Sequence, residues 1–115
     1  MKRFKLISVH ETAGVTIVSP HTKRLYMQDT DLFKAEMIEL LNYVHQDIII
    51  DFSSVNIVNS LAIGVLIASA SEMRTRHKQF VIVGLNPALH EIFKRMRLDS
   101  IFDIRKDVRE GMAVL

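Results

Sequence analysis

The side chains best suited to chemistry lie in residues 48–66, whose sequence is IIIDFSSVNIVNSLAIGVL. An apolar run predicts a buried strand, a polar loop follows it, and the segment from Asn59 and Ser60 onward predicts a helix. The Ser60 hydroxyl would then lie at a helix N-terminus. A phosphate attached there would meet unpaired backbone N–H groups and the positive end of the helix dipole, so the fold could accept about two extra negative charges. This local arrangement suits regulation by phosphorylation.

Ordinary helix capping is the alternative explanation of the same residues. Asn and Ser side chains both accept a hydrogen bond from the first helical turn when they act as N-caps. From residue types alone, capping by Asn59 or Ser60 is favoured over a modification site. Ser53 and Ser54, in the preceding loop, are further candidate phospho-acceptors, but both are favoured as plain turn residues.

Asp51 is the other side chain of interest in this segment, because it ends the predicted strand. The α/β proteins commonly place functional groups at the carboxyl ends of their strands. The Asp51 carboxylate could bond to N–H groups of the loop or lie near Ser60. We favour structural loop closure over a direct functional role.

The elements that must position these side chains alternate between strands and helices. Residues 4–9 and 15–19 are rich in β-branched residues and predict a hairpin at an antiparallel edge. Residues 48–50 form an uninterrupted apolar run, which is typical of a strand at the sheet centre with both faces covered. Residues 80–83 predict the next central strand, and residues 101–104 predict a last short one.

The helices are predicted from apolar residues at helical spacing. Residues 31–45 predict an amphipathic helix that packs on the sheet, and the helix from Ser60 has almost wholly apolar first turns. Asn86 and Pro87 predict the cap and first residue of a further helix, and residues 107–114 predict a terminal one. In the helix of residues 31–45 the apolar stripe is Phe33, Met37, Leu40, Leu41 and Val44, and the opposite side carries Lys34, Glu36 and Glu39.

Helices that alternate with strands imply right-handed crossovers onto a mainly parallel sheet. The sequence therefore predicts an α/β sandwich with a mixed, mainly parallel sheet of about five strands and four to five helices. A length of 115 residues with 49% apolar content matches a single domain over residues 1–115. The order of the strands does not follow from the sequence.

The amino-acid composition limits the cellular compartment and the classes of partner that we expect. Cysteine is absent, which excludes disulfides and thiolate metal sites and fits a reducing compartment. The longest apolar run, at residues 61–68, is far shorter than the roughly 20 residues that a membrane span needs, so we expect a cytoplasmic protein without a membrane span. The net charge is +2, and the basic clusters lie partly at predicted helix ends, where cations are favoured, with no aromatic residues between them. We expect no nucleic-acid partner.

Motifs for catalysis and cofactor binding are missing from the sequence. Neither of the glycine-rich phosphate-binding motifs, G-x-x-x-x-G-K-S/T and G-x-G-x-x-G, occurs. The five histidines never pair at metal-binding helical spacing, and Ser60 lies in V-N-S-L-A, without the glycines of a hydrolase elbow. Asp29 and Asp31 are favoured as helix-cap residues over an acid/base pair. We therefore expect no catalytic residues, no metal and no cofactor, and interpret the chain as a binding protein rather than an enzyme.

Four segments carry a resemblance to a known family: IIIDFSSV, NSLAIGVL, FVIVGLNP and LHEIFKRMRLDSIF. Together they resemble the STAS domain of anti-sigma-factor antagonists. In that family a strand ending in Asp precedes an Asp-Ser pair, and a glycine-rich helix start follows. Asp51 matches the strand-end Asp, Ser60 matches the phosphorylated serine, and Gly64 matches the second helix glycine. The late segment of the family matches Leu98, Asp99 and Phe102.

Three residues depart from the family pattern. Asn59 stands where the family usually carries Asp, and Ala62 and Arg97 stand where it usually carries Gly. Asparagine keeps the shape of aspartate and loses its charge. Asn59 can therefore accept a hydrogen bond but cannot serve as a carboxylate base for the serine proton.

The resemblance implies a STAS-like sandwich and a regulatory function in bacterial transcription. Such a protein captures a serine-kinase anti-sigma factor and thereby frees a sigma factor. Phosphorylation of Ser60 by the kinase would switch it off, and a phosphatase would restore it. Unphosphorylated, the start of the helix would offer a compact apolar surface to the partner. The candidate partner-binding residues are Asp51, Ser53, Ser54, Asn59, Ser60, Leu61, Ala62 and Ile63.

Asn59 also motivates a second hypothesis, in which Ser60 is only a cap. The domain would then be a non-phosphorylated scaffold subunit of a stress-signalling assembly or of a lipid-transport ATPase complex. A third hypothesis, an enzymatic or small-ligand function, has only the general α/β fold to support it. A homodimer is compatible with the sequence in each case.

Overall fold

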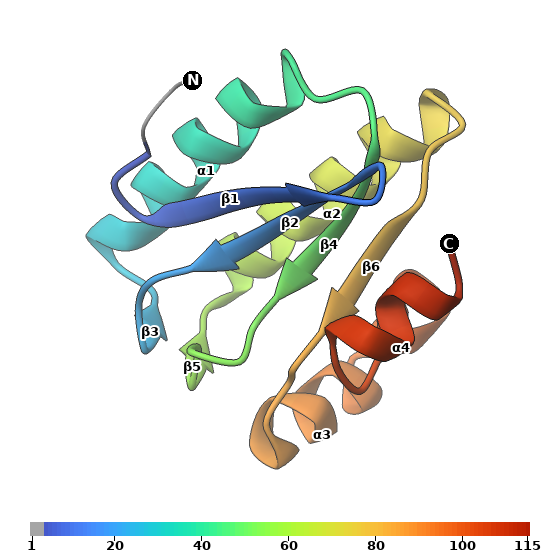
Figure 1. The fold of residues 1–115 in the computed structure, drawn as a ribbon. Coiled ribbons are helices and arrows are strands. Elements are labelled where there is room, and N and C mark those ends of the chain that lie inside the picture. The colour runs from blue at the N-terminus through green and yellow to red at the C-terminus, as the bar shows by residue number, and fades with distance from the viewer. Residues whose placement is uncertain (1–3) are drawn as a thin grey trace.

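The structure is a computed structural model that describes residues 4–115. Its main element is a five-stranded sheet with the strand order β1-β2-β4-β6-β7 (Figure 1). The first pair is antiparallel and the other neighbours are parallel, which confirms the expected mixed, mainly parallel sheet. The strands are β1 (Ile7–Thr12), β2 (Val15–Pro20), β4 (Asp47–Asp51), β6 (Phe80–Val83) and β7 (Asp103–Arg105).

Helices cover both faces of this sheet (Figure 1). The first two helices lie side by side on one face, and the short C-terminal helix packs on the other face against β4 and β6. No helix within residues 4–115 has the length and apolar character that crossing a membrane requires. The α-helices in this part of the chain are α1 (Gln28–Leu41), α2 (Ser60–Thr75), α3 (Pro87–Arg95) and α4 (Val108–Ala113).

Strand β4 lies in the centre of the sheet, as its uninterrupted apolar run predicted. Ile48 and Ile50 pack into the larger core beneath α1 and α2, whereas Ile49 packs into a smaller cluster beneath α4. All three side chains are fully buried. Because both faces of the strand are covered, its middle positions are all apolar, and the usual alternation is lost.

Helix α1 begins and ends earlier than the predicted helix of residues 31–45. The preceding residue, Met27, has a φ of 56° and a ψ of −130°, so the change to helical geometry occurs at Gln28. At the other end, the carbonyl oxygens of Leu41 and Val44 accept hydrogen bonds from Nη1 of Arg76, at 2.6 and 3.3 Å. These carbonyl groups are bound by the side chain of the residue that follows α2 and do not continue the helix.

Two further strands form a small second sheet that the sequence did not predict. β3 (Arg24–Leu25) pairs in parallel with β5 (Ile57–Val58). Strands of two residues are too short to show a periodic pattern. β5 directly precedes Asn59, whose backbone N–H donates to the Leu25 carbonyl at 3.2 Å. The small sheet therefore fixes the chain just before α2 begins.

The last strand begins two residues later than expected. Leu98–Ser100 form a 3-10 helix, and the N–H groups of Ile101 and Phe102 both bond to the Leu98 carbonyl, at 3.0 and 2.8 Å. This turn uses residues that the sequence analysis assigned to the strand, so β7 starts only at Asp103. The terminal helix α4 agrees with the predicted residues 107–114 to within one residue at each end.

Glu36 is the clearest correction to the sequence analysis, which places it on the solvent side of the first helix. Its side chain is buried, with only 6% of its surface exposed. The carboxylate accepts hydrogen bonds from the backbone N–H groups of Lys5, Leu6 and Ile7, at 2.6, 2.8 and 3.1 Å. A buried charge needs partners of this kind. Since the N–H groups of Lys5 and Leu6 bond to a side chain rather than to a strand, β1 begins at Ile7 rather than at residue 4.

Candidate functional site

Ser60 is the first residue of α2, and Asn59 is the N-cap. Asn59 has extended backbone geometry, with a φ of −101° and a ψ of 174°, and its Oδ1 accepts a hydrogen bond from the Ala62 N–H at 2.9 Å. Ser60 is exposed, and its hydroxyl makes no hydrogen bond within residues 4–115. The two local roles that the sequence allowed are thus divided between neighbours: Asn59 caps the helix and the Ser60 hydroxyl remains accessible.

Thr30, from α1, holds the capping side chain from the other side. Nδ2 of Asn59 donates to the Thr30 hydroxyl oxygen at 3.1 Å, and Thr30 is only 3% exposed. Thr30 was not among the predicted site residues. Its signal is its spacing, because Thr30 lies three and seven residues before Phe33 and Met37 of the apolar stripe. The N-termini of α1 and α2 are therefore joined directly at the candidate phosphorylation site.

The Asn59 side chain bonds to both neighbouring helices. Its Oδ1 caps α2, and its Nδ2 donates to the Thr30 hydroxyl, which also lies 3.4 Å from Oδ1 and could donate to a carboxylate in its place. A neutral cap also avoids placing a negative charge beside the position that would carry a phosphate. The carbonyl of Asn59 accepts the Ile63 N–H at 3.1 Å, which begins the helical ladder.

Replacement of Asn59 by alanine is expected to lower the free energy of unfolding by about 2 kcal/mol. Roughly 1 kcal/mol comes from the lost cap, and about as much from the buried Thr30 hydroxyl left without its partner. Urea unfolding measures the loss. Asn86→Ala is the matched control, because Asn86 caps α3 through the Leu89 N–H at 2.8 Å and no other hydrogen bond of its side chain is present in the described part of the chain. Equal losses in the two variants would contradict a role for Thr30.

Asp51 and Ser53 form a closed turn at the end of β4. Oδ1 of Asp51 accepts hydrogen bonds from the Ser53 N–H at 3.0 Å and from the Ser53 hydroxyl at 2.5 Å. Gly84 approaches this turn so closely that a Cβ there would lie 2.6 Å from Ser53 Oγ and 2.7 Å from Asp51 Oδ1, and its φ is +78°. Glycine alone meets both conditions. The turn therefore occupies the Asp51 carboxylate, while Ser54 is exposed beside it.

The remaining predicted partner-binding residues divide into one exposed residue and two buried ones. Leu61 is 65% exposed, whereas Ala62 and Ile63 are buried, at 0% and 5%. The expected apolar surface of residues 61–63 is therefore reduced to Leu61, because the helix turns the next two side chains into the core. Two exposed residues that the sequence analysis missed lie on the segments that lead into α1 and α2, namely Met27, 70% exposed, and Ile57, 47% exposed.

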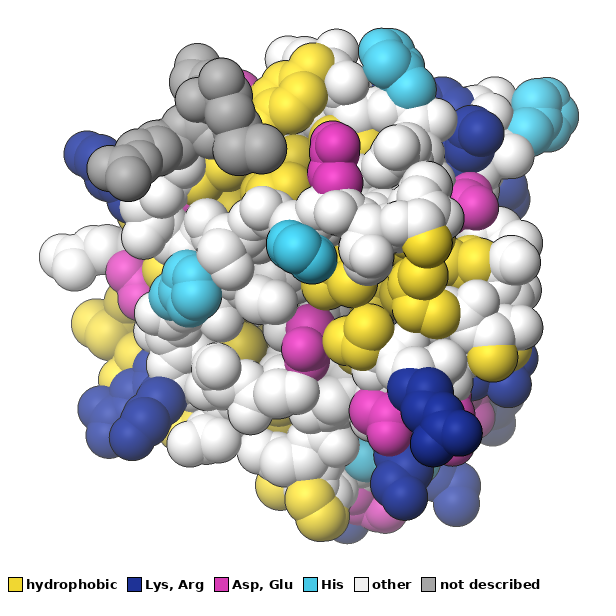
Figure 2. Space-filling model, in the orientation of Figure 1, with side chains coloured by type: hydrophobic (Ala, Val, Ile, Leu, Met, Phe, Trp, Pro, Cys, Tyr) yellow, Lys and Arg dark blue, Asp and Glu magenta, His cyan; other side chains and the backbone are white. Residues whose placement is uncertain are grey.

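The charged and titratable side chains are the other candidates for a site in the described part of the chain. Within residues 4–115, no group of three or more His, Asp or Glu side chains is placed to hold a metal ion. Figure 2 shows that, on the face seen in Figure 1, lysine and arginine side chains lie near the margins and among acidic ones rather than in one basic surface. Burial raises the pKa of the Tyr43 phenol, with a smaller contribution from Glu11.

Comparison with known proteins gives the same family over nearly the whole chain. The family model of the STAS domain matches residues 7–111. Among solved structures, an anti-sigma-factor antagonist (STAS) domain protein from Planctomyces limnophilus superposes with a TM-score of 0.86 and is 17% identical, covering 94% of this chain and 96% of that one. An anti-sigma factor antagonist from Mycobacterium paratuberculosis has a TM-score of 0.82 at 18% identity, covering 94% and 91%.

A third solved structure is the Bacillus cell fate determinant SpoIIAA in its phosphorylated form. It has a TM-score of 0.68 at 12% identity and covers 95% of this chain and 99% of that one. At these identities the structures show a common fold, and the family model shows the family. The STAS family model covers most of the chain and the solved structures share its five-stranded mixed sheet, so the matches lead to one conclusion: the chain belongs to the STAS domain family.

Proposed function

We propose that this chain binds a serine-kinase anti-sigma factor and is released from it when the kinase phosphorylates Ser60. The observation that carries the proposal is the division of roles at the start of α2. Asn59 supplies the cap, so the exposed Ser60 hydroxyl has no structural task within residues 4–115. SpoIIAA, which shares the fold, is described in a phosphorylated form. The chain would act in the cytoplasm as a single domain and as a substrate, not as an enzyme.

The chemistry of the switch follows from the site. The kinase would transfer the γ-phosphoryl group of ATP to Ser60 Oγ, and ADP would leave. The hydroxyl proton needs a base, and the Asn59 amide cannot take it. We therefore assign the base to the kinase. A phosphatase would hydrolyse the ester and restore the hydroxyl.

A phosphate at Ser60 would change the partner surface more than the fold. It would lie at the N-terminus of α2, where negative charge is favoured. It would also lie beside Leu61, the exposed apolar residue at this end of the helix. About two negative charges at the edge of an apolar contact would have to lose water when the partner binds, which weakens the complex.

A retention experiment in lysate of the native host tests the proposal. Wild-type, Ser60→Ala and Ser60→Glu proteins serve as baits, and the retained proteins are identified by mass spectrometry. We expect wild type and Ser60→Ala to retain an ATP-binding kinase and Ser60→Glu to release it. With ATP, the retained kinase should phosphorylate wild type at Ser60 and leave Ser60→Ala unmodified. Retention of one large complex by all three baits would instead indicate a scaffold subunit in which Ser60 is not a switch.

A further inference from the structure

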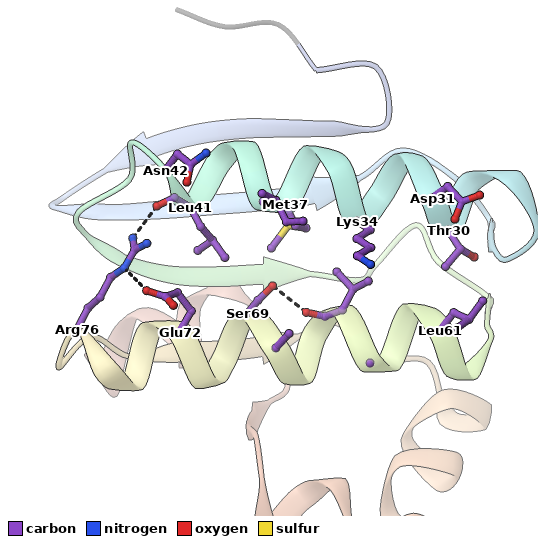
Figure 3. A pocket seen from close by; sticks show the side chains of 14 residues that line it. Thr30, Asp31, Lys34, Met37, Leu41, Asn42, Leu61, Ser69, Glu72 and Arg76 are labelled. Atoms are coloured by element: carbon purple, nitrogen blue, oxygen red, sulfur yellow. Dashed lines mark hydrogen bonds and ion pairs between the residues drawn. The ribbon is translucent and has the colours of Figure 1, made fainter.

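A groove of about 770 Å³ lies between α1 and α2 on the face of the helices that points away from the sheet (Figure 3). Thr30 and Leu61 lie at one end of it, and Asn42 and Arg76 lie at the other. Two apolar side chains on its walls are strongly exposed: Leu61 at 65%, and Ile38 at 53%. The groove therefore begins at the residue that follows Ser60 and runs along both helices.

Gly64 lies in this groove, exposed and in the interior of α2. Glycine inside a helix is less favourable than alanine, because it loses more conformational freedom on folding. A Cβ at Gly64 would meet no heavy atom within 4 Å. The packing of Gly64 contrasts with that of Gly111, where a Cβ would lie 3.1 Å from Ile49 and Val83. Nothing in the described fold requires the missing side chain at position 64.

The polar side chains of the groove differ in how far they are already engaged. Arg76 is bound within the chain, because it pairs with Glu72 at 2.9 Å and donates to the Leu41 carbonyl at 2.6 Å. Lys34 and Asp31, which line the groove from α1, make no side-chain hydrogen bond or ion pair within residues 4–115. Lys34 thus leaves a cation available beside the apolar walls, and Asp31 leaves an anion at the end where Leu61 lies.

We propose that the groove binds a helix of the same kinase partner, with an apolar face against Leu61 and Ile38, its backbone passing over Gly64, and a carboxylate facing Lys34. This inference rests on the proposed function, because the partner that responds to Ser60 must cover the surface next to it. The space between two adjacent helices is where the side chains of a third helix pack. Gly64 and the exposed Ala68 allow a close approach of backbones. This complex would explain Gly64, because the glycine lowers the stability of the free protein but lets the partner helix approach α2 closely.

Two substitutions at Gly64 test the inference, with the purified kinase from the retention experiment as the ligand. Gly64→Ala is expected to raise the Tm of the free protein by roughly 2 to 6 °C and to weaken the kinase Kd about 3-fold. Gly64→Leu should weaken it roughly 10-fold or more, and Lys34→Glu by a similar factor through like-charge repulsion. Ala35→Leu is the matched control, because Ala35 is exposed on α1 outside the groove, and its Kd should stay within about 2-fold of wild type.

The possible results separate this inference from the proposed function. If Gly64→Leu binds the kinase like wild type while Ser60→Glu is released, the groove is not used and the switch still holds. If Ser60→Glu binds with full affinity, the proposed function is wrong. The inference about the groove, which depends on the same partner, is then wrong with it. Sedimentation of the wild-type protein alone tests whether a second copy of this chain occupies the groove. A dimer that Gly64→Leu dissociates would assign the groove to a second copy of this chain and overturn the inference.

Discussion

Replacement of Glu36 by alanine is expected to lower the free energy of unfolding by about 3 kcal/mol. The Glu36 carboxylate accepts three backbone hydrogen bonds, from the N–H groups of residues 5 to 7. The alanine variant leaves these donors without a partner, and the side chains of Leu6 and Ile7 beside them are 6% and 2% exposed. Each buried donor without a partner costs roughly 1 kcal/mol or more. Denaturant unfolding followed by circular dichroism measures the loss.

Two further variants show whether the carboxylate itself is responsible. Glu36→Gln keeps the size and one acceptor oxygen but turns an NH₂ group toward backbone donors, so roughly half of the loss is expected. Glu91→Ala removes an exposed glutamate that pairs with Arg95 at 3.5 Å, and should change stability by less than about 0.5 kcal/mol. If Glu36→Ala is as stable as Glu91→Ala, the carboxylate does not anchor the start of β1.

The wrong prediction for Glu36 shows that a single sequence does not reveal contacts between a side chain and a distant backbone segment. Phe33, Glu36, Met37 and Leu40 follow the i, i+3, i+4, i+7 spacing of a buried stripe. Glu36 was nevertheless predicted to face solvent because it is charged, and unpaired carboxylates are rarely buried. Its partners are backbone N–H groups some thirty residues earlier. Backbone groups have no signature in the sequence, so this contact becomes visible only when the strand and the helix are placed together.

Elements with local signals were predicted well. Asn86 and Pro87 were expected as the cap and first residue of a helix, and Asn86 indeed accepts the Leu89 N–H with Pro87 at the start of α3. The interactions behind such signals act within one helical turn. The strand order and the pairing of β3 with β5 instead depend on contacts between distant segments, and no local pattern determines them.

The same distinction holds at the candidate site. Asn59 and Ser60 were placed at a helix start from residue types alone, because capping is local. Thr30 was missed because it comes from another helix and reaches Asn59 only through tertiary packing. Ala62 and Ile63 were expected at the partner surface because they are apolar and follow the serine, yet both are buried. Composition near a site therefore overestimates the exposed apolar surface when the helix period is not applied to each position.

Ser60→Glu is expected to weaken binding of the kinase by about 100-fold, which is ~2.8 kcal/mol, and to leave the fold intact. A glutamate in the first turn of α2 interacts favourably with the helix dipole, so the Tm should stay equal or rise slightly. The same charge lies beside the exposed Leu61 and must lose water in the complex. Isothermal titration with the purified kinase gives the affinity, and thermal unfolding gives the stability.

Ser71→Glu is the control that separates charge from position. Ser71 is an exposed serine of the same helix, three turns after Ser60, so the variant has the same net charge without a negative group at the start of α2. Its kinase affinity should remain within about 3-fold of wild type. A full phosphate carries about twice the charge of glutamate, so the phosphorylated protein should bind more weakly still. If Ser60→Glu and Ser71→Glu lose affinity equally, the kinase responds to overall charge, and the position of Ser60 at the N-terminus of α2 does not make it a switch.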